Sequence, residues 1–322
     1  MKKLLPLLLA CLLLTGCTRE PIFPTETESA APVPAPVTAD IPRYADQATL
    51  WFRCGTEPFL AAESRAESHS RTESHALALL RALVAGPGAA STELTGLFPQ
   101  GTQVISCTQA GRVMFVTLSK HIMNGYADEP VDWRLQSAWA VEVPLRRQLA
   151  MQSIAATLTE NCDVDSVVIM VEQKNTSTDS LRLRQSYFTL DGDTTLAAPL
   201  MRDESLLLTP ARTAEVILQA WQEKDYTRLY RFIARTDPAT GAARPEEADF
   251  LQQIRSLPVL LNFTARGGSI SADGQQAVFT VSGAYLDGGE SRPFTGMTLR
   301  LIREKGVWRI VLAELTERGT MQ

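Results

Sequence analysis

Apolar residues in the first half of the chain fall into short runs with strand-like spacing. These runs lie at residues 49–53, 103–107, 112–118 and 166–171. The last run is continuous and mostly β-branched, which is typical of a buried strand. The second and third runs flank Gln109-Ala110-Gly111, which predicts a hairpin.

Two stretches between these runs have helical spacing instead. The first repeats apolar residues at the i, i+3, i+4, i+7 and i+8 positions of a core-facing helix: Ala76, Leu79, Leu80, Leu83 and Val84. A short helix is expected over 133–142, and Pro144 suits the first turn of a second long helix that ends near Asn161. The order β-α-β-β-α-β predicts an α+β sandwich, with helices over a sheet, at residues 48–175.

A direct repeat of six residues precedes the first helix. Residues 64–69 read SRAESH and residues 70–75 read SRTESH. Ser70 and Glu73 have the spacing of a capping box, so the helix is expected to start just after Ser70, behind a solvated polar loop. His69 and His75 would lie on different faces of a helix, so we expect no metal site; one would need a flexible loop and a third ligand.

The second half of the chain has helical patterns first and strand patterns afterwards. Thr209 can cap a helix whose first turn holds Pro210. After further helices up to about residue 256, strands are expected at 260–265, 277–285, 297–303 and 308–313, separated by glycine-containing turns. This predicts a second domain at 209–318, joined to the first by a connector at 176–208.

Two resemblances follow from these residues. The helix end LLRALVAGP (79–87), LFPQGT (97–102), the strand VMFVTLS (113–119) and SIAATLTE (153–160) resemble the GerM domain of sporulation and spore-germination lipoproteins, over about residues 48–172. This resemblance implies a scaffold that docks other envelope or sporulation proteins, as a homo- or hetero-oligomer. The helix break at 221–226 and the strand GVWRI (306–310) resemble the NTF2-like cone, which implies room for a small ligand.

The N-terminus is organised as a secretory signal. Lys2 and Lys3 precede an apolar run at 4–14, which is too short to span a bilayer that needs about 20 residues. Leu-Thr-Gly-Cys at 14–17 resembles the bacterial lipobox, which implies a signal peptide at 1–16 and acyl chains such as palmitate on Cys17. A proline-rich tether at 17–47 follows, and its stretch from 18 to 44 has a reach of about 80 Å. We therefore expect a lipid-anchored protein on the extracytoplasmic face of a bacterial membrane.

Composition narrows the functional classes. The chain has 322 residues, of which 45% are hydrophobic and 21% charged, and its net charge of −5 argues against nucleic-acid binding. Cys54, Cys107 and Cys162 remain after Cys17, and their wide spacing does not suggest zinc binding. They are either small buried apolar residues or include one disulfide, and both alternatives stay open.

No nucleophile, zinc-protease, phosphate-loop or dinucleotide motif is present in the sequence. Several polar residues are expected to lie at the surface, in turns or at helix ends: His121, Asp128, Glu129, Asp163, Asp165, Asp225, Asp237 and Asp249. We predict no catalytic residue, no metal and no cofactor. The expected function is a non-enzymatic scaffold in an envelope assembly, in sporulation or germination; the alternative is a lipoprotein that binds a small ligand, such as a cell-wall fragment, in the cone.

Overall fold

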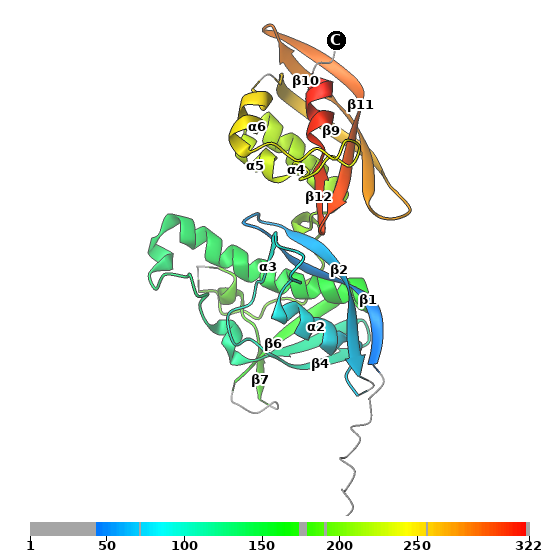
Figure 1. The fold of residues 1–322 in the computed structure, drawn as a ribbon. Helices are drawn as coiled ribbons and strands as arrows, with labels where there is room; N and C mark the ends of the chain where they lie inside the picture. The colour runs from blue at the N-terminus through cyan, green and yellow to red at the C-terminus, as the bar shows by residue number, and fades with distance from the viewer. Residues whose placement is uncertain (1–42, 71, 174–178, 190–191, 256, 320–322) are drawn as a thin grey trace, which may run out of the picture. The chain divides into compact units, whose positions relative to one another are not determined.

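The computed structural model describes residues 43–70, 72–173, 179–189, 192–255 and 257–319 (Figure 1). The predicted signal peptide, Cys17 and nearly all of the tether lie outside the described residues. Residues 42–322 cluster as one compact unit. Among the described helices, none is both long enough and apolar enough to cross a membrane.

The first sheet contains the first copy of the polar repeat, which was expected to be a loop. Strand β1 (Arg43–Cys54) pairs antiparallel with β2 (Leu60–Ser70) on one side and with β3 (Leu94–Thr95) on the other. In β2 the small residues at 64, 66 and 68 are exposed, whereas the long side chains of Arg65, Glu67 and His69 are half-buried. This two-residue period is that of a strand, so the loop prediction was wrong for the first copy of the repeat.

Helix α2 (His75–Ala85) begins later than the capping-box prediction. Ser74 is the N-cap, and its hydroxyl accepts the backbone N–H of Leu77 at 3.2 Å. Ser70 is instead the last residue of β2, and Glu73 pairs with Arg81 at 2.5 Å. The buried face carries Leu79, Leu80 and Leu83, as the spacing predicted.

The second sheet has the order β4-β5-β6-β7, and β8 also pairs with β6. Its strands are β4 (Val104–Ala110), β5 (Val113–Leu118), β6 (Ser166–Glu172), β7 (Ser180–Arg182) and β8 (Leu200–Met201). β4 and β5 form the predicted hairpin, where Gly111 has φ 62°. β5 and β6 are parallel, so a crossover must join them.

That crossover is helix α3 (Ser137–Asn161), which runs straight through the position where two helices were expected. Pro144 lies inside the helix, not in its first turn. The loss of one backbone donor is offset by contacts around it, since Val143 is buried and Glu142 pairs with Arg146 at 2.6 Å. Further along, Leu149, Met151, Ile154 and Leu158 are fully buried in the core.

Short 3-10 turns complete this region: η1 (Lys120–Met123), η2 (Trp133–Leu135), η3 (Gln185–Tyr187) and η4 (Glu204–Leu206). The predicted helix over 133–142 is therefore split between η2 and the start of α3. The α+β class is confirmed, although β1 and β2 form a hairpin where the pattern predicted a single short strand at 49–53 followed by a loop.

The C-terminal region has the predicted order of helices and strands. Its helices are α4 (Pro210–Gln222), α5 (Tyr226–Arg231) and α6 (Glu247–Ile254), and Thr209 caps α4 by accepting the N–H of Arg212 at 3.2 Å. An antiparallel meander follows, made of β9 (Val259–Ile270), β10 (Gln276–Asp287), β11 (Glu290–Glu304) and β12 (Val307–Ile310). The last strand ends early, because α7 (Leu312–Gly319) begins where it was expected to continue.

Side chains fill the space between these helices and the meander. Trp221 of α4 is buried, and its indole N–H donates to the carbonyl of Pro258 at 3.0 Å. Phe250, Val281 and Leu301 are also buried. Figure 1 shows α4, α5 and α6 on one side of the sheet.

Candidate functional site

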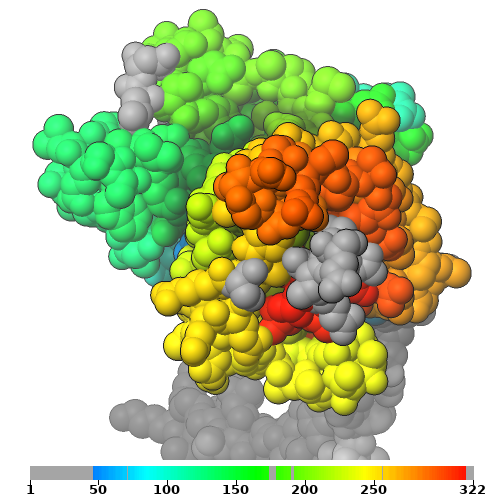
Figure 2. Space-filling model, turned by 90° about the horizontal axis from the view of Figure 1, so that it is seen from above, coloured from blue at the N-terminus to red at the C-terminus, as the bar shows by residue number. Residues whose placement is uncertain are grey.

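The most exposed large apolar side chains in the described residues lie in one segment, residues 120–141, which we call the exposed segment. Val131 is 103% exposed, Leu135 87% and Val141 70%. Isolated exposed apolar residues are ordinary on protein surfaces, but a concentration of them in a short segment is typical of an interaction site. In Figure 2 the teal-green surface of this segment is uncovered.

Arginine–aromatic contacts hold the exposed segment against helix α3. The guanidinium of Arg147 lies 5.4 Å from the ring of Trp133 and 5.1 Å from that of Tyr187. Arg146 lies 5.3 Å from the rings of both Tyr126 and Trp139. The contacts to Tyr126 and Trp133 tie the part of the segment before α3 to that helix, whereas Trp139 lies on α3 itself. The apolar residues are therefore displayed on an ordered support.

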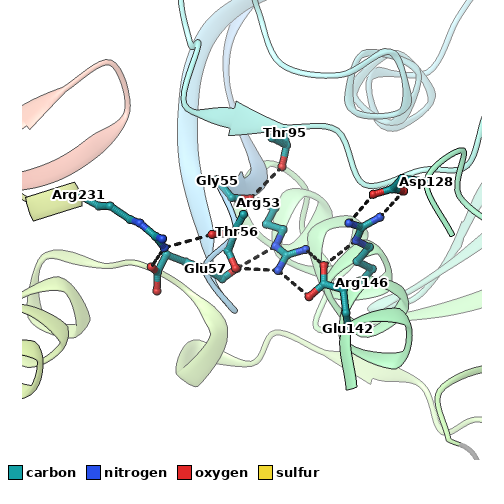
Figure 3. Close-up of polar contacts among 9 residues, drawn as sticks. All are labelled: Arg53, Gly55, Thr56, Glu57, Thr95, Asp128, Glu142, Arg146 and Arg231. Carbon is teal, nitrogen blue, oxygen red and sulfur yellow. Dashed lines mark hydrogen bonds and ion pairs between the residues drawn. The ribbon is translucent and has the colours of Figure 1, made fainter. Parts of the chain in front are cut away.

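A charged network fixes the start of α3 to the end of strand β1 (Figure 3). Arg146 donates to both carboxylate oxygens of Asp128 at 2.7 and 2.9 Å, and to Glu142 at 2.6 Å. Arg53 binds the same Glu142 with both terminal nitrogens, one of them at 3.1 Å. It also donates to the carbonyls of Thr56 and Glu57 at 2.8 and 2.9 Å.

The charges in this network are satisfied, and this favours a structural role. Burial opposes the charge on Glu142, but hydrogen bonds from Arg53 and Arg146 outweigh it and lower the pKa of the carboxyl. The hydrogen bonds from Arg146 likewise lower the pKa of Asp128. Both groups are ionised at neutral pH, so neither is suited to act as a general acid.

The network continues from the turn after β1 to helix α5. Glu57 is buried and accepts hydrogen bonds from Arg228 at 3.0 Å and from Arg231 at 3.1 Å. Figure 3 shows Arg231 reaching Glu57 from the side opposite to Arg53. A buried carboxylate between two arginines stabilises the position of this turn, because its charge is paired on both oxygens.

Two of the three histidines, His69 and His75, are arranged differently from the expectation. His121 lies on the surface, as predicted, with Nδ1 3.4 Å from the Ser119 hydroxyl. His69 and His75 were expected to point apart, but their ring centroids are 5.4 Å apart, and Asp46 joins them in a cluster. The alternation of small and long residues in SRAESH is the signal that could have revealed a strand, and with it the return of the chain toward His69.

Most of the predicted surface carboxylates lie where expected. Asp163 and Asp165 pair with the exposed Arg112, and Asp225 caps α5 by accepting the N–H of Arg228 at 3.0 Å. Asp237 accepts the N–H of Ala239 in a loop, and Asp249 lies in the first turn of α6. Glu129 is the exception, since its side chain is only 7% exposed and accepts the N–H of Tyr126.

The three cysteines are free thiols in the structure. Burial raises the pKa of Cys54 to about 11, and burial together with the nearby Cys162 raises that of Cys107 to about 12. Burial also raises the pKa of Cys162. Because the thiolate is the nucleophile, these groups are poorly reactive at neutral pH. This agrees with the interpretation of the cysteines as small apolar residues.

Comparisons with known proteins single out the first half of the chain. The model of the Germane family, described as "Sporulation and spore germination", matches residues 55–177. The first GerMN domain of the sporulation protein GerM from Bacillus subtilis is 17% identical, with 49% of this chain and 98% of that chain covered and a TM-score of 0.31. The tandem GerMN domains of the same protein are 16% identical, with 49% and 46% covered and a TM-score of 0.30. The chain thus spans less than half of the tandem structure, and no curated protein matches it.

Proposed function

We propose that this chain, which carries a Germane domain at residues 55–177, is a non-enzymatic docking component of an envelope assembly. The proposal keeps the predicted organisation: a signal peptide at 1–16, a lipidated Cys17 with its tether at 17–47, domains at 48–175 and 209–318, and a connector at 176–208. The NTF2-like assignment of the last domain is part of the proposal. The partner we infer is another folded envelope or sporulation protein.

The exposed segment is the observation that carries this function. Val131, Leu135 and Val141 would lose contact with water on binding a protein partner, and this loss favours association. The cation–π contacts of Arg146 and Arg147 already order their support, so binding costs little further conformational entropy. An ordered apolar surface beside a satisfied charged network is suited to protein recognition.

The same geometry supports a role without catalysis. In the network the carboxylates of Asp128 and Glu142 are each neutralised by arginine. Ser119 lies near His121, but its hydroxyl is buried and already accepts the N–H of Gln103 at 3.0 Å. A nucleophilic serine needs an accessible hydroxyl and an oriented base, and this pair offers neither.

Site-specific photo-crosslinking in cells tests the docking surface. A photoreactive residue at Leu135 should capture a specific envelope protein during growth or sporulation, and the substitution Val131→Asp should reduce that capture. A photoreactive residue at Ile270, an exposed apolar position on β9, is the matched control. Equal capture from both positions, or none from Leu135 at any stage, would contradict the proposal.

The anchor is tested separately by the substitution Cys17→Ala. The variant should be released from membranes while its circular dichroism spectrum stays unchanged. A variant that remains in the membrane fraction would show that lipid on Cys17 is not the anchor.

The small-ligand alternative rests on cavity size alone. One cavity, beside α7, measures about 250 Å³, and another of about 390 Å³ is lined by Tyr230, Phe232 and Arg309 together with Glu57 and Glu93. Typical small-molecule sites measure about 300–1,000 Å³. A rise in the melting temperature of the full chain with peptidoglycan fragments, together with no crosslinked protein, would nevertheless favour the alternative.

A further inference from the structure

Three potential metal ligands from three elements converge at the start of strand β1. They are Asp46 of β1, His69 near the end of β2 and His75, the first residue of α2. One ligand atom from each lies within 4.8 Å of the other two. No other part of the described chain groups three such residues, so the cluster is specific to this corner.

Backbone pairing explains why the cluster forms. In the β1–β2 ladder Tyr44 is opposite His69 and Asp46 is opposite Glu67, so Asp46 and His69 are diagonal neighbours on one face of the hairpin. Arg65 on the same face donates to the carbonyls of Ala82 and Gly86, which ties α2 across that face. The short connection from β2 to α2 then returns His75 to His69.

One polar atom of the cluster has no hydrogen-bond partner. His75 Nδ1 is buried and has no hydrogen-bond partner. The nearest carboxylate oxygen, Oδ2 of Asp46, is 3.8 Å away, which is beyond hydrogen-bond range. Earlier in β2, by contrast, Glu63 and Glu67 both pair with Arg65. No described arginine or lysine pairs with Asp46.

We propose that Asp46, His69 and His75 bind a divalent transition-metal ion, with zinc as the favoured ion. Two imidazoles and one carboxylate are a common ligand set for zinc, whereas magnesium and calcium favour oxygen ligands alone. Zinc–ligand bonds are about 2.0–2.2 Å long, so the three side chains must move closer together by changing rotamer. Asp46 is 59% exposed, which leaves an open side for water as a fourth ligand.

A bound ion would clamp the first described strand to helix α2. The N-terminal end of a helix disfavours a cation, but the carboxylate of Asp46 offsets this at the same place. The clamp would lie next to the point where the proline-rich tether is expected to enter the domain. Metal binding would therefore stiffen the attachment of the domain to its anchor, independently of the docking function proposed above.

Metal titration of the full chain, purified without a histidine tag, tests this site. We expect one zinc ion per chain by calorimetry, and a cobalt complex whose spectrum has no thiolate charge-transfer band. Loss of a group that supports a metal ligand commonly costs about 10–100-fold in affinity, so His69→Ala and His75→Ala should each cost at least about tenfold. Asp46→Asn should weaken binding less, and magnesium and calcium should not compete.

The third histidine provides the matched control. His121→Ala removes an imidazole outside the cluster and should leave zinc affinity unchanged. Zinc should also raise the melting temperature of the wild-type chain and of His121→Ala, but not that of His75→Ala. If His75→Ala fails to fold, His75→Gln takes its place.

Three results would overturn the proposal. They are zinc binding that survives in the His75 variants, equal loss of binding in His121→Ala, and a thiolate band that assigns the metal to the cysteines. Absence of binding at micromolar zinc would overturn it as well. None of these results depends on whether Leu135 captures a partner protein.

Discussion

Strand β1 carries a cluster of charged and polar side chains at each end, and the two clusters differ in how completely they are paired. Near its C-terminal end, Arg53 joins Glu142, Arg146 and Asp128 in a network of short, directed hydrogen bonds. Near its start, Asp46 meets His69 and His75, and the buried Nδ1 of His75 has no hydrogen bond.

The difference follows from the chemistry of the side chains. A guanidinium offers five N–H donors in a planar fork, and this fork matches the two oxygens of a carboxylate. Each nitrogen of a neutral imidazole is either one hydrogen-bond donor or one acceptor. Two adjacent imidazoles therefore cannot form hydrogen bonds to all of each other's ring nitrogens. The arginine cluster is thus complete as a structural unit, whereas the histidine cluster is suited to receive a ligand.

Breaking the arginine cluster should have the largest effect. Arg53→Met removes the buried donor to Glu142 and to the carbonyls of Thr56 and Glu57, and leaving buried acceptors unsatisfied costs about 1–3 kcal/mol. Arg53 is only 6% exposed, which is why we expect a large loss of unfolding free energy in urea. The control is Arg112→Met, because Arg112 is 59% exposed and should shift the midpoint far less. Equal shifts would mean that the network is not structural.

The second-largest effect is expected in the pH dependence of stability, which tests the paired charges of the arginine cluster. The pKa of Glu142 is lowered in the folded state from its ordinary value of 4.5, so its stabilisation is present above about pH 4.5 and is lost as pH falls through the folded pKa. Glu142→Gln removes that contribution and should cost about 1.5 kcal/mol at pH 7. Urea midpoints should therefore converge for wild type and variant in acid. A constant difference at all pH values would contradict this assignment.

The histidine cluster should tolerate substitution when metal is absent. His75→Ala in the presence of a chelator should change the unfolding free energy by less than about 1 kcal/mol, because it removes a partly exposed ring whose Nδ1 has no hydrogen bond. Zinc at 100 times its Kd should stabilise the wild type by about 2.7 kcal/mol and leave the variant unchanged. A large loss in the chelated variant would instead give the cluster a metal-independent structural role.

The smallest effect on stability is expected at the exposed segment. Val131→Ser and Leu135→Ser remove fully exposed apolar groups and should change the unfolding free energy by less than about 0.5 kcal/mol. Thermal unfolding followed by circular dichroism measures this directly. A marked loss of stability would show that the segment packs against the domain and is not free for a partner.

Much of the fold could be predicted from the sequence because the signals were local. Leu79, Leu80 and Leu83 repeat with helical spacing, Thr209 caps its helix, and Gly111 makes the hairpin turn. The Germane resemblance, carried by residues within 48–172, is confirmed by the family match at 55–177. Pro144 was misplaced because packing around Val143 and Glu142 outweighs the local preference of proline.

The candidate sites could be predicted less well. The apolar residues Val131 and Leu135 do not differ in sequence from core residues, and only their exposure in the folded chain marks them. The prediction treated His69 and His75 as residues of one helix, whereas the structure places His69 on a strand and His75 on the helix that follows it.

The two copies of the hexapeptide repeat show where the limit lies. SRAESH at 64–69 is part of a strand, whereas SRTESH at 70–75 supplies the end of that strand, the Ser74 cap and the first residue of α2. Local sequence by itself determined where helices could begin, which faces were apolar and where turns could occur, because these depend on neighbouring residues. Only the tertiary structure decided that the first copy pairs with β1 and that both histidines meet Asp46, because strand pairing depends on partners distant in the sequence.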